Sequence, residues 1–304
     1  MTTMLEDHTN ASGEATDYFR RLQGKTALVT GSGRGIGKAI ALAFAGAGCN
    51  VACVSRTNSE VVAVANSINS TTAYEARAFV CDVSDISSLP ALIREIKQWI
   101  NRPISILVNN AGLARIEALE FERDITSWQQ IIATNLTAPA ALSYAILPDM
   151  LSSEDGVIMS VGSRNAIYNI PYMNAYSVSK TGLLRFHENL ERELSGKGVC
   201  SYYVVPGNVQ TSILAGKGTV DEKSIRHSAG ARRMVEAIAT CEKTSAEKFA
   251  AICVKLAVDK RASLLSGRYI DTEGDLAAVF EDVQNGNESK CVKEGLYKLK
   301  VDKL

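Results

Sequence analysis

The sequence predicts an α/β protein: a doubly wound parallel sheet of about seven strands with helices on both faces, in a single domain. Short β-branched runs alternate with longer amphipathic segments, an alternation that favours right-handed crossovers between parallel strands. Most of the short runs are apolar throughout, as is typical of strands covered on both faces. The chain has 304 residues, of which 46% are hydrophobic, enough for one large core.

The expected elements follow in order along the chain. The strands are expected at Thr26–Thr30, Asn50–Ser55, Ala76–Cys81, Ile104–Asn109, Val157–Val161, Val199–Val205 and Arg268–Ile270. Between them, helix-length segments lie near 35–47, 59–69, 86–100, 124–150, 174–195 and 231–258. Residues 1–23 form a polar N-terminal extension, 24–275 the folded domain, and 276–304 a C-terminal extension that packs on the domain or on a partner subunit.

Composition argues against several classes of protein. The 33 Lys and Arg balance 33 Asp and Glu, so no general basic field is present to hold nucleic acid. The N-terminus lacks the apolar region of a secretory signal, and the apolar stretch Ala39–Val54 is too interrupted to cross a membrane. The seven Cys are scattered without a metal-binding spacing, which indicates free thiols, a reducing compartment and no metal site. We therefore expect a cytoplasmic protein.

A glycine-rich stretch, Thr30–Gly37, follows the first expected strand and opens the first expected helix. Glycines there permit a tight turn and let the backbone approach a pyrophosphate, which the free N–H groups of the helix N-terminus then bind. This context predicts a dinucleotide site. The residues assigned to the turn are Gly31, Ser32, Arg34, Gly35, Ile36 and Gly37.

The end of the second strand indicates which dinucleotide is bound. An NAD site usually places an acidic residue there to accept hydrogen bonds from the ribose 2′-OH. This chain has Ser55 and Arg56 instead, so we expect nothing acidic to be present to repel a 2′-phosphate. Arg56, with Arg34 as a second cation, favours NADP(H) over NAD(H). The alternative is that both arginines are solvated surface residues.

Asp82 follows the third expected strand, and two roles are open for it. Its carboxylate either accepts from the adenine amino group or caps a turn beside Ser84 and Asp85.

A second set of polar residues falls later in the chain. Tyr176 and Lys180 lie four residues apart in an expected helix, which puts both on one face. A phenol of pKa about 10 needs a neighbouring ammonium to act as a general acid-base at neutral pH. Ser163 follows a strand end, where ligand-contacting groups collect. Asn135 lies inside an expected helix, so its amide is predicted to satisfy a backbone group or hold a water.

In order and spacing, these motifs resemble the classical short-chain dehydrogenases/reductases over residues 25 to about 275. The resemblance implies a Rossmann-like fold and an NADP-preferring oxidoreductase. The matching elements are Thr30–Gly37, Asp82 with Val83, Asn109–Gly112, Asn135, Ser163, Tyr176 with Lys180, and Pro206–Thr211.

The resemblance also implies roles. Tyr176 donates the proton to the carbonyl in reduction, and Lys180 binds the nicotinamide ribose and lowers the tyrosine pKa. Ser163 orients the carbonyl and stabilises developing oxyanion charge. Asn135 holds a water in a proton relay to Lys180. Further cofactor contacts are implied for Ser55, Arg56, Asp82, Val83, Asn109, Ala111, Gly112, Tyr176, Lys180, Pro206, Gly207, Val209 and Thr211.

Two departures from the family pattern stand out. Ser163 is followed by Arg164, Asn165 and Ala166, where many relatives carry small residues. Arg164 either reaches an anionic substrate group or is solvated or ion-paired. The glycine-rich ending is altered to Ser266–Asp275 and further residues follow, which changes the region of the usual C-terminal subunit contacts.

The resemblance places a substrate lid at about 212–240, with Gly216 and Gly218 as possible hinges. Its basic residues either attract a carboxylate or thioester ligand or form a solvated helix face; they are Lys217, Lys223, Arg226, His227, Arg232 and Arg233. Apolar side chains before Tyr176 either line a pocket for a bulky carbonyl compound or pack in the core. They are Ile167, Tyr168, Ile170, Pro171, Tyr172 and Met173.

We therefore expect an NADP(H)-dependent enzyme that transfers hydride between nicotinamide and a carbonyl or alcohol carbon, in the leading hypothesis reducing a bulky ketone with Tyr176 as general acid-base. Its partners are a small-molecule carbonyl or alcohol and further copies of itself, as a homodimer or homotetramer through the helices that hold Asn135 and Tyr176. The alternatives are isomerisation, elimination or cyclisation on the same scaffold, or a non-catalytic NADP-binding regulator.

Overall fold

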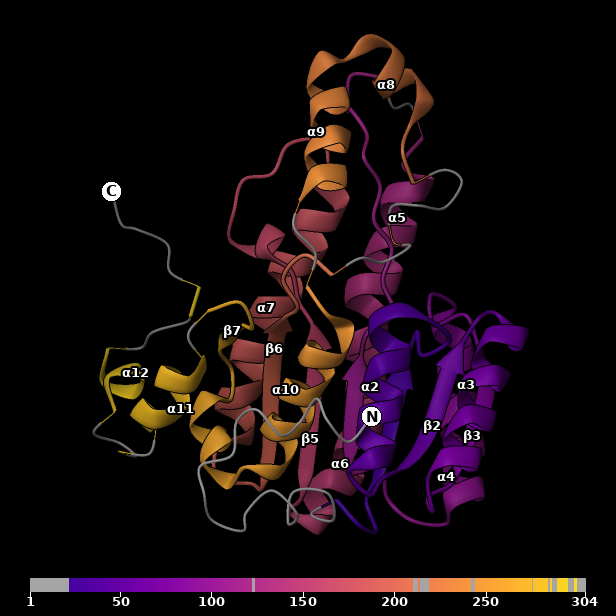
Figure 1. Cartoon of the computed structure of the whole chain (residues 1–304), viewed down its shortest axis with the longest axis vertical. Helices are drawn as coiled ribbons and strands as arrows, with labels where there is room; N and C mark the ends of the chain where they lie inside the picture. Colours follow the sequence, from indigo (N-terminus) through magenta and orange to yellow (C-terminus); the bar gives the residue numbers. More distant parts are fainter. Residues whose placement is uncertain are drawn as a thin grey trace.

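A seven-stranded parallel sheet organises the chain, in the order β3-β2-β1-β4-β5-β6-β7 (Figure 1). The computed structural model describes residues 22–121, 124–209, 213, 219–241, 244–274, 276–283, 285, 289–294 and 298–299. The strands are β1 (Thr26–Thr30), β2 (Asn50–Ser55), β3 (Ala76–Val80), β4 (Ile106–Asn109), β5 (Gly156–Val161), β6 (Val199–Val205) and β7 (Tyr269–Asp271). All seven expected strands are thus confirmed, with ends shifted by at most two residues.

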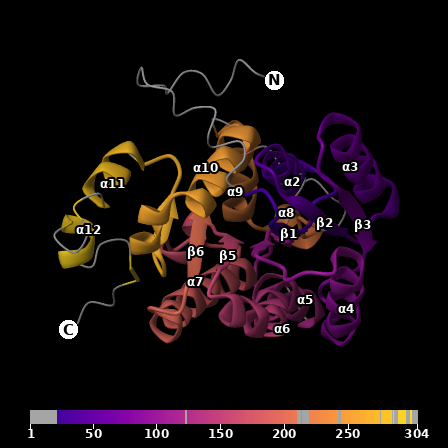
Figure 2. The same ribbon diagram turned by 90° about the horizontal axis from the view of Figure 1, so that it is seen from below.

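Helices cover both faces of the sheet, as Figure 2 shows. One layer contains α2 (Gly35–Gly46), α3 (Asn58–Thr71) and α10 (Ala246–Val258), and the other contains α4 (Leu89–Ile100), α6 (Ala138–Ser153) and α7 (Asn174–Leu194). Each layer has its own buried apolar cluster, with Phe44 and Phe249 in the first and Leu107 and Ile146 in the second. Every residue of β1 is buried, so its largely apolar sequence reflects this double cover.

The strand order reverses at β1, which pairs with β2 on one side and with β4 on the other. Chain connections leave the carboxyl ends of these strands in opposite directions, which opens a crevice at that edge of the sheet. The glycine-rich turn after β1 and the Asn109–Gly112 segment after β4 therefore lie side by side.

The expected helix 124–150 is one continuous helical run with a change of winding inside it. Helix α5 (Thr126–Ile132) passes through a π-helical turn, η4 (Ala133–Thr137), into α6. The run Thr126–Ser153 is long and apolar enough by composition to cross a membrane, a test that core helices also pass. Here α6 buries Leu142, Ile146 and Met150 against the sheet.

The expected helix 231–258 is wrong as a single element. The structure has α8 (Glu222–His227), α9 (Ala229–Thr240) and then a separate α10. The break has a local cause: the Ser245 hydroxyl accepts hydrogen bonds from the Glu247 and Lys248 N–H groups and so starts a new helix. Figure 1 shows α8 and α9 projecting beyond the sheet, on the side of α5.

Both ends of the described chain add to the domain. Leu22 is buried in the first core, so packed chain begins inside the stretch assigned to the N-terminal extension. In the C-terminal extension, α11 (Leu276–Val283) buries Phe280 and Val283, and α12 (Lys290–Lys293) follows beside it near β7 (Figure 1). The Lys255 ammonium lies 4.1 Å from the Phe280 ring centroid. Short 3-10 turns complete the fold: η3 (Ile86–Ser88), η5 (Arg164–Ala166) and η7 (Lys260–Leu265).

Candidate active site

A cavity of about 420 Å³ lies at the carboxyl edge of the sheet. Its walls come from the turn after β1, the ends of β2 and β4, the turn after β5, helix α7 and the turn after β6. Ligand-binding crevices in open α/β sheets form at this edge. Most of the residues predicted from sequence to bind cofactor or substrate line this one cavity.

The glycine-rich turn is shaped by contacts that only glycine permits. Gly31 has φ +64°, and a Cβ on Gly37 would overlap the Gly31 carbonyl oxygen and the Asn110 amide. The Asn110 Nδ2 donates to the carbonyl oxygens of Thr30 at 2.8 Å and Gly31 at 3.1 Å. Asn110 thus holds the turn in a shape that a pyrophosphate can approach. The sequence analysis assigned cofactor contacts to Asn109, Ala111 and Gly112 but not to Asn110. Its position directly after β4 was the available signal.

The adenosine end of the cavity holds an acid that the sequence analysis overlooked. Ser55, Arg56 and Arg34 all line it, as predicted. Glu60, in the first turn of α3, lines it too, and its carboxylate lies 3.1 Å from the Arg34 guanidinium. A 2′-phosphate bound by Arg34 would compete with this carboxylate, whereas Arg56 is exposed beside it. The expectation that nothing acidic lies near was therefore wrong, since Glu60 is brought in by α3 rather than by the strand end.

Asp82 caps a turn, which is one of the two roles left open for it. Its Oδ1 accepts from the Ser84 N–H at 3.0 Å and from the Ser84 hydroxyl at 2.7 Å. Asp82 and Val83 both line the cavity as well, so the cap also fixes the wall where adenine would lie.

The Tyr176 and Lys180 side chains lie together at the inner end of the cavity, on one face of α7. The Lys180 ammonium lies 5.6 Å from the centre of the Tyr176 ring and donates to the Val161 carbonyl oxygen at 2.8 Å. Burial lowers the pKa of Lys180 to about 8. Burial also raises the pKa of Tyr176, although a hydrogen bond with the Ser163 side chain acts in the opposite direction. Without a bound cofactor the phenol therefore keeps its proton.

Ser163 is held at the start of η5, directly after β5. Its Oγ lies 3.1 Å from Asn165 Oδ1 and accepts from the Asn165 N–H at 3.2 Å. The Tyr203 hydroxyl accepts from the Ser163 N–H at 2.9 Å and donates to the Ser163 carbonyl oxygen at 3.1 Å. The Ser163 backbone is thus fixed while its hydroxyl faces the cavity beside Tyr176.

Asn135 is buried in the π-helical turn, a feature often found at functional sites. Its Oδ1 accepts from the Leu113 N–H, and its Nδ2 donates to the Leu113 carbonyl oxygen, both at 2.8 Å. Nδ2 also lies 3.0 Å from the Ser179 hydroxyl. The amide therefore satisfies backbone groups, one of the two roles expected for it, and ties the loop after β4 to α7. Asn109, at the end of β4, is also buried, and its Nδ2 donates to the Ser160 hydroxyl at 3.4 Å.

The turn after β6 closes the other side of the cavity. Pro206, Gly207 and Val209 line it, and Gly207 has φ +69°. The Thr244 hydroxyl donates to the Pro206 carbonyl oxygen at 3.2 Å, and Val209 forms an isolated bridge with Thr244. Thr211, with the lid positions Gly216, Lys217 and Gly218, lies outside the described residues.

The described part of the lid is joined to the loop after β4. Ile116 and Val220 form a parallel bridge, and Arg115 lies 3.3 Å from Asp221. The other described basic residues of the lid are exposed, which agrees with the solvated-face alternative: Lys223, Arg226, His227, Arg232 and Arg233. Of the apolar side chains before Tyr176, three pack in a cluster with it and the lid, namely Ile170, Tyr172 and Met173. The remaining three, Ile167, Tyr168 and Pro171, are exposed.

Arg164 is ion-paired, which was one of the two alternatives for it. Its guanidinium binds Asp271 at 2.8 Å and Glu273 at 2.7 Å. Neither acid was predicted as a site residue, because both stand more than 100 positions further along the chain. The altered ending of the domain was the only sequence signal for them.

Comparisons with known proteins agree with this geometry. The model of the short chain dehydrogenase family matches residues 25–223. A short chain dehydrogenase of Pseudocercospora fijiensis is 33% identical over 92% of this chain and 90% of that protein.

Two solved structures are similar over most of the chain. One, described as an NAD(P)-dependent gluconate 5-dehydrogenase from Beutenbergia cavernae with bound NADP, has a TM-score of 0.71 and 28% identity, covering 86% of this chain and 99% of that one. A metagenomic short-chain oxidoreductase in complex with NADP has a TM-score of 0.64 and 26% identity, covering 79% and 93%. The family match and the shared fold identify this chain as a member of the short-chain dehydrogenase/reductase family, an oxidoreductase acting on a CH–OH or C=O group.

Proposed function

We propose that this protein is an NADP(H)-dependent carbonyl reductase that acts on a bulky, largely apolar ketone. One observation carries the proposal: Ser163, Tyr176 and Lys180 converge at the inner end of a single cavity whose outer end holds Arg34 and Arg56. NADPH, which has a hydride-donating nicotinamide at one end and a 2′-phosphate at the other, matches both ends of the cavity.

The chemistry follows from the state of each side chain. When NADPH is bound, its nicotinamide supplies the hydride. The Ser163 hydroxyl donates to the substrate carbonyl oxygen and leaves its contact with Asn165 to do so. The buried Tyr176 phenol, whose raised pKa keeps it protonated, then gives its proton to the same oxygen. The Lys180 ammonium stabilises the phenolate that remains, and Asn135 holds the loop after β4 against α7.

NADP(H) preference rests on the cations at the adenosine end. Arg56 is exposed at the end of β2 and can bind a 2′-phosphate bidentately. Arg34 joins it once the phosphate displaces the Glu60 carboxylate. The two similar structures that carry NADP support the same preference.

Substrate class is inferred from the cluster above Tyr176. Its buried part includes Ile116 and Met173, and two of the apolar side chains packed against them, Ile213 and Ile238, line the cavity together with Leu113. This apolar part of the cavity wall suits apolar substituents on the ketone. Exposed Tyr144 on α6 and Val178 on α7 support pairing of those helices in a homodimer or homotetramer, and sedimentation as a monomer at micromolar concentration would contradict it. Among the cysteines whose side chains the structure describes, all six carry free thiols, which fits a reducing compartment such as the cytoplasm.

The test follows NADPH absorbance with a panel of ketones, quinones and thioester ketones, for wild type and Tyr176→Phe. We expect turnover in wild type and its loss in the variant, with NADPH binding kept in both. NADPH binding without turnover of any compound would refute the reductase proposal. Product analysis without net NADPH consumption would then look for isomerisation, elimination or cyclisation.

A further inference from the structure

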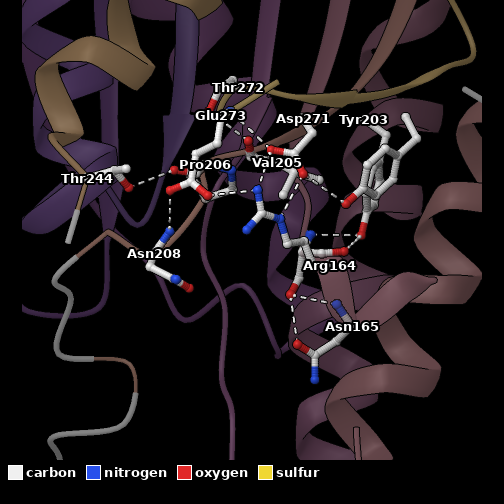
Figure 3. Close-up of polar contacts among 12 residues, drawn as sticks. Arg164, Asn165, Tyr203, Val205, Pro206, Asn208, Thr244, Asp271, Thr272 and Glu273 are labelled. Atoms are coloured by element: carbon white, nitrogen blue, oxygen red, sulfur yellow. Dashed lines mark hydrogen bonds and ion pairs between the residues drawn. The ribbon is translucent and has the colours of Figure 1, made fainter. Parts of the chain in front are cut away.

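Arg164, the residue directly after Ser163, belongs to a three-membered ionic cluster at the edge of the cavity (Figure 3). Its Nε donates to Asp271 Oδ2 at 2.8 Å and one terminal nitrogen to Asp271 Oδ1 at 3.1 Å. The same terminal nitrogen lies 2.7 Å from Glu273 Oε2. The guanidinium is therefore held bidentately by one carboxylate and shared with a second, which allows it little rotation.

The cluster reaches across to the turn after β6. Glu273 accepts from the Asn208 N–H at 3.3 Å through its second oxygen, Oε1. Its carboxylate fills the space over Gly207, where any Cβ would overlap it. Figure 3 shows Arg164 between Asn165 and Tyr203 on one side and Pro206 and Asn208 on the other. One side chain thus connects the turn after β5 with the turn after β6 through residues at the end of β7.

The same turn is anchored independently through its backbone. Tyr203 binds both the N–H and the carbonyl oxygen of Ser163, and its ring stacks on Tyr269 at a centroid distance of 5.8 Å. Tyr203 fixes Ser163 against β6, but it makes no link to the Pro206–Asn208 turn. Within the described residues, Arg164 with its two acids supplies that link.

The net charge of the cluster favours a positioning role for Arg164 over a role in binding substrate. One guanidinium faces two carboxylates, so the cluster carries a net negative charge and attracts no anionic substrate. The two turns that it joins bear on the two reacting partners: Ser163 holds the carbonyl, and the Pro206–Asn208 turn lines the cavity where the nicotinamide end would lie. Transfer between bound reactants depends steeply on their separation, and a misplacement of about 1 Å costs roughly 100-fold in rate.

We propose that Arg164 is a positioning residue that, through Asp271 and Glu273, sets the distance between the Ser163 turn and the Pro206–Asn208 turn, and hence the approach of the carbonyl carbon to the nicotinamide. This inference rests on the proposed reductase function. It assigns Asp271 and Glu273 a share in catalysis although neither touches the reacting atoms.

The first measurement needs no substrate. Fluorescence titration compares NADPH with adenosine 2′,5′-bisphosphate, which lacks the nicotinamide, in wild type and Arg164→Met. We expect NADPH affinity to fall by about tenfold while affinity for the bisphosphate stays within twofold, because only the nicotinamide end meets the displaced turn. Equal loss for both ligands would indicate general unfolding and overturn the proposal. Failure of wild type to bind NADPH would instead refute the proposed function.

The second measurement reads the transfer step, with the ketone that wild type reduces fastest. With NADPH deuterated at both C4 positions, Arg164→Met is expected to lower kcat by roughly 10- to 100-fold and to increase the deuterium isotope effect, since transfer becomes rate-limiting. Arg164→Lys should recover part of the rate. An unchanged kcat and isotope effect in Arg164→Met would overturn the proposal.

A matched control and a milder variant complete the test. Arg261 forms a similar bidentate pair with Asp259, at 2.8 and 2.7 Å, away from the cavity, so Arg261→Met should leave kcat and the isotope effect as in wild type. If Arg164→Met fails to fold, Glu273→Gln keeps an acceptor for Asn208 but weakens the ion pair. That variant is expected to show the same changes to a smaller extent, and wild-type behaviour in it would contradict the proposal.

Discussion

Buried His187 should make the protein unstable in mild acid. The ring lies on the inner face of α7, with Nδ1 2.6 Å from the Ser201 hydroxyl and Nε2 2.7 Å from the Ser160 hydroxyl. Burial lowers the pKa of His187 from 6.5 to about 3. Between these two values the unfolded chain binds a proton that the folded protein does not, so the free energy of unfolding falls as pH falls through this window.

The size of the effect follows from the two pKa values. At pH 5, ionisation of this residue in the unfolded state costs about 2 kcal/mol of stability relative to pH 7. His187→Gln keeps a hydrogen-bonding amide but cannot titrate. The variant is expected to be less stable than wild type at pH 7 because its packing changes, yet to lose about 2 kcal/mol less on going to pH 5.

The assay is urea unfolding of the cofactor-free protein, followed by circular dichroism at pH 7, 6 and 5. His227→Gln, at an exposed position on α8, serves as the control and should keep the pH profile of wild type. Equal losses of unfolding free energy in wild type and His187→Gln between pH 7 and pH 5 would refute the reasoning, since the buried neutral ring would then contribute nothing to the pH dependence.

Three further predictions concern the cavity. Gly37→Ala should weaken NADPH binding by more than about tenfold, because its methyl group would overlap the Gly31 carbonyl oxygen; a fluorescence titration checks this, and unchanged affinity would contradict it. Lys180→Met should abolish turnover yet stabilise the cofactor-free protein at pH 7 by up to about 3 kcal/mol, an advantage that disappears in urea unfolding as pH rises from 8 toward 10.5. Arg56→Asp should lower NADPH affinity by more than about tenfold and leave NADH affinity the same or higher, and parallel titrations that show an unchanged preference would exclude Arg56 as the 2′-phosphate ligand.

The features that sequence reasoning predicted are those encoded locally. Predominantly apolar runs flanked by glycine and polar residues mark the strands, since strands covered on both faces bury mostly apolar side chains. The Tyr176 and Lys180 pair follows from helical spacing, and the turn Thr30–Gly37 from glycines at fixed offsets. Residues close in sequence decide each of these features, so one window of the chain suffices to predict it.

What sequence reasoning missed depends on packing between distant segments. Glu60 meets Arg34 only because α3 folds back over the turn after β1. The raised pKa of Tyr176 arises from burial in the assembled cavity, whereas spacing alone predicts the opposite direction through Lys180. The bridge between Ile116 and Val220 joins segments that no periodicity connects.

Two departures from the family pattern, separate in the sequence, meet in space as one feature. Arg164 stands where the resemblance to the family predicts a small residue, and Asp271 lies in the altered ending of the domain. With the two joined bidentately, loss of Arg164 leaves Asp271 and Glu273 without their shared cation, and loss of Asp271 leaves Arg164 with Glu273 alone.

A double-mutant cycle tests this dependence. The free energies of unfolding of Arg164→Met, Asp271→Leu and the double variant should differ from additivity by about 1 kcal/mol or more, with the double variant more stable than the sum of the single losses predicts. Additivity within about 0.5 kcal/mol would show that the two positions act independently. Coupling would instead mean that Arg164 and the altered ending are one structural adaptation, so that an arginine after Ser163 requires an acid at the end of β7.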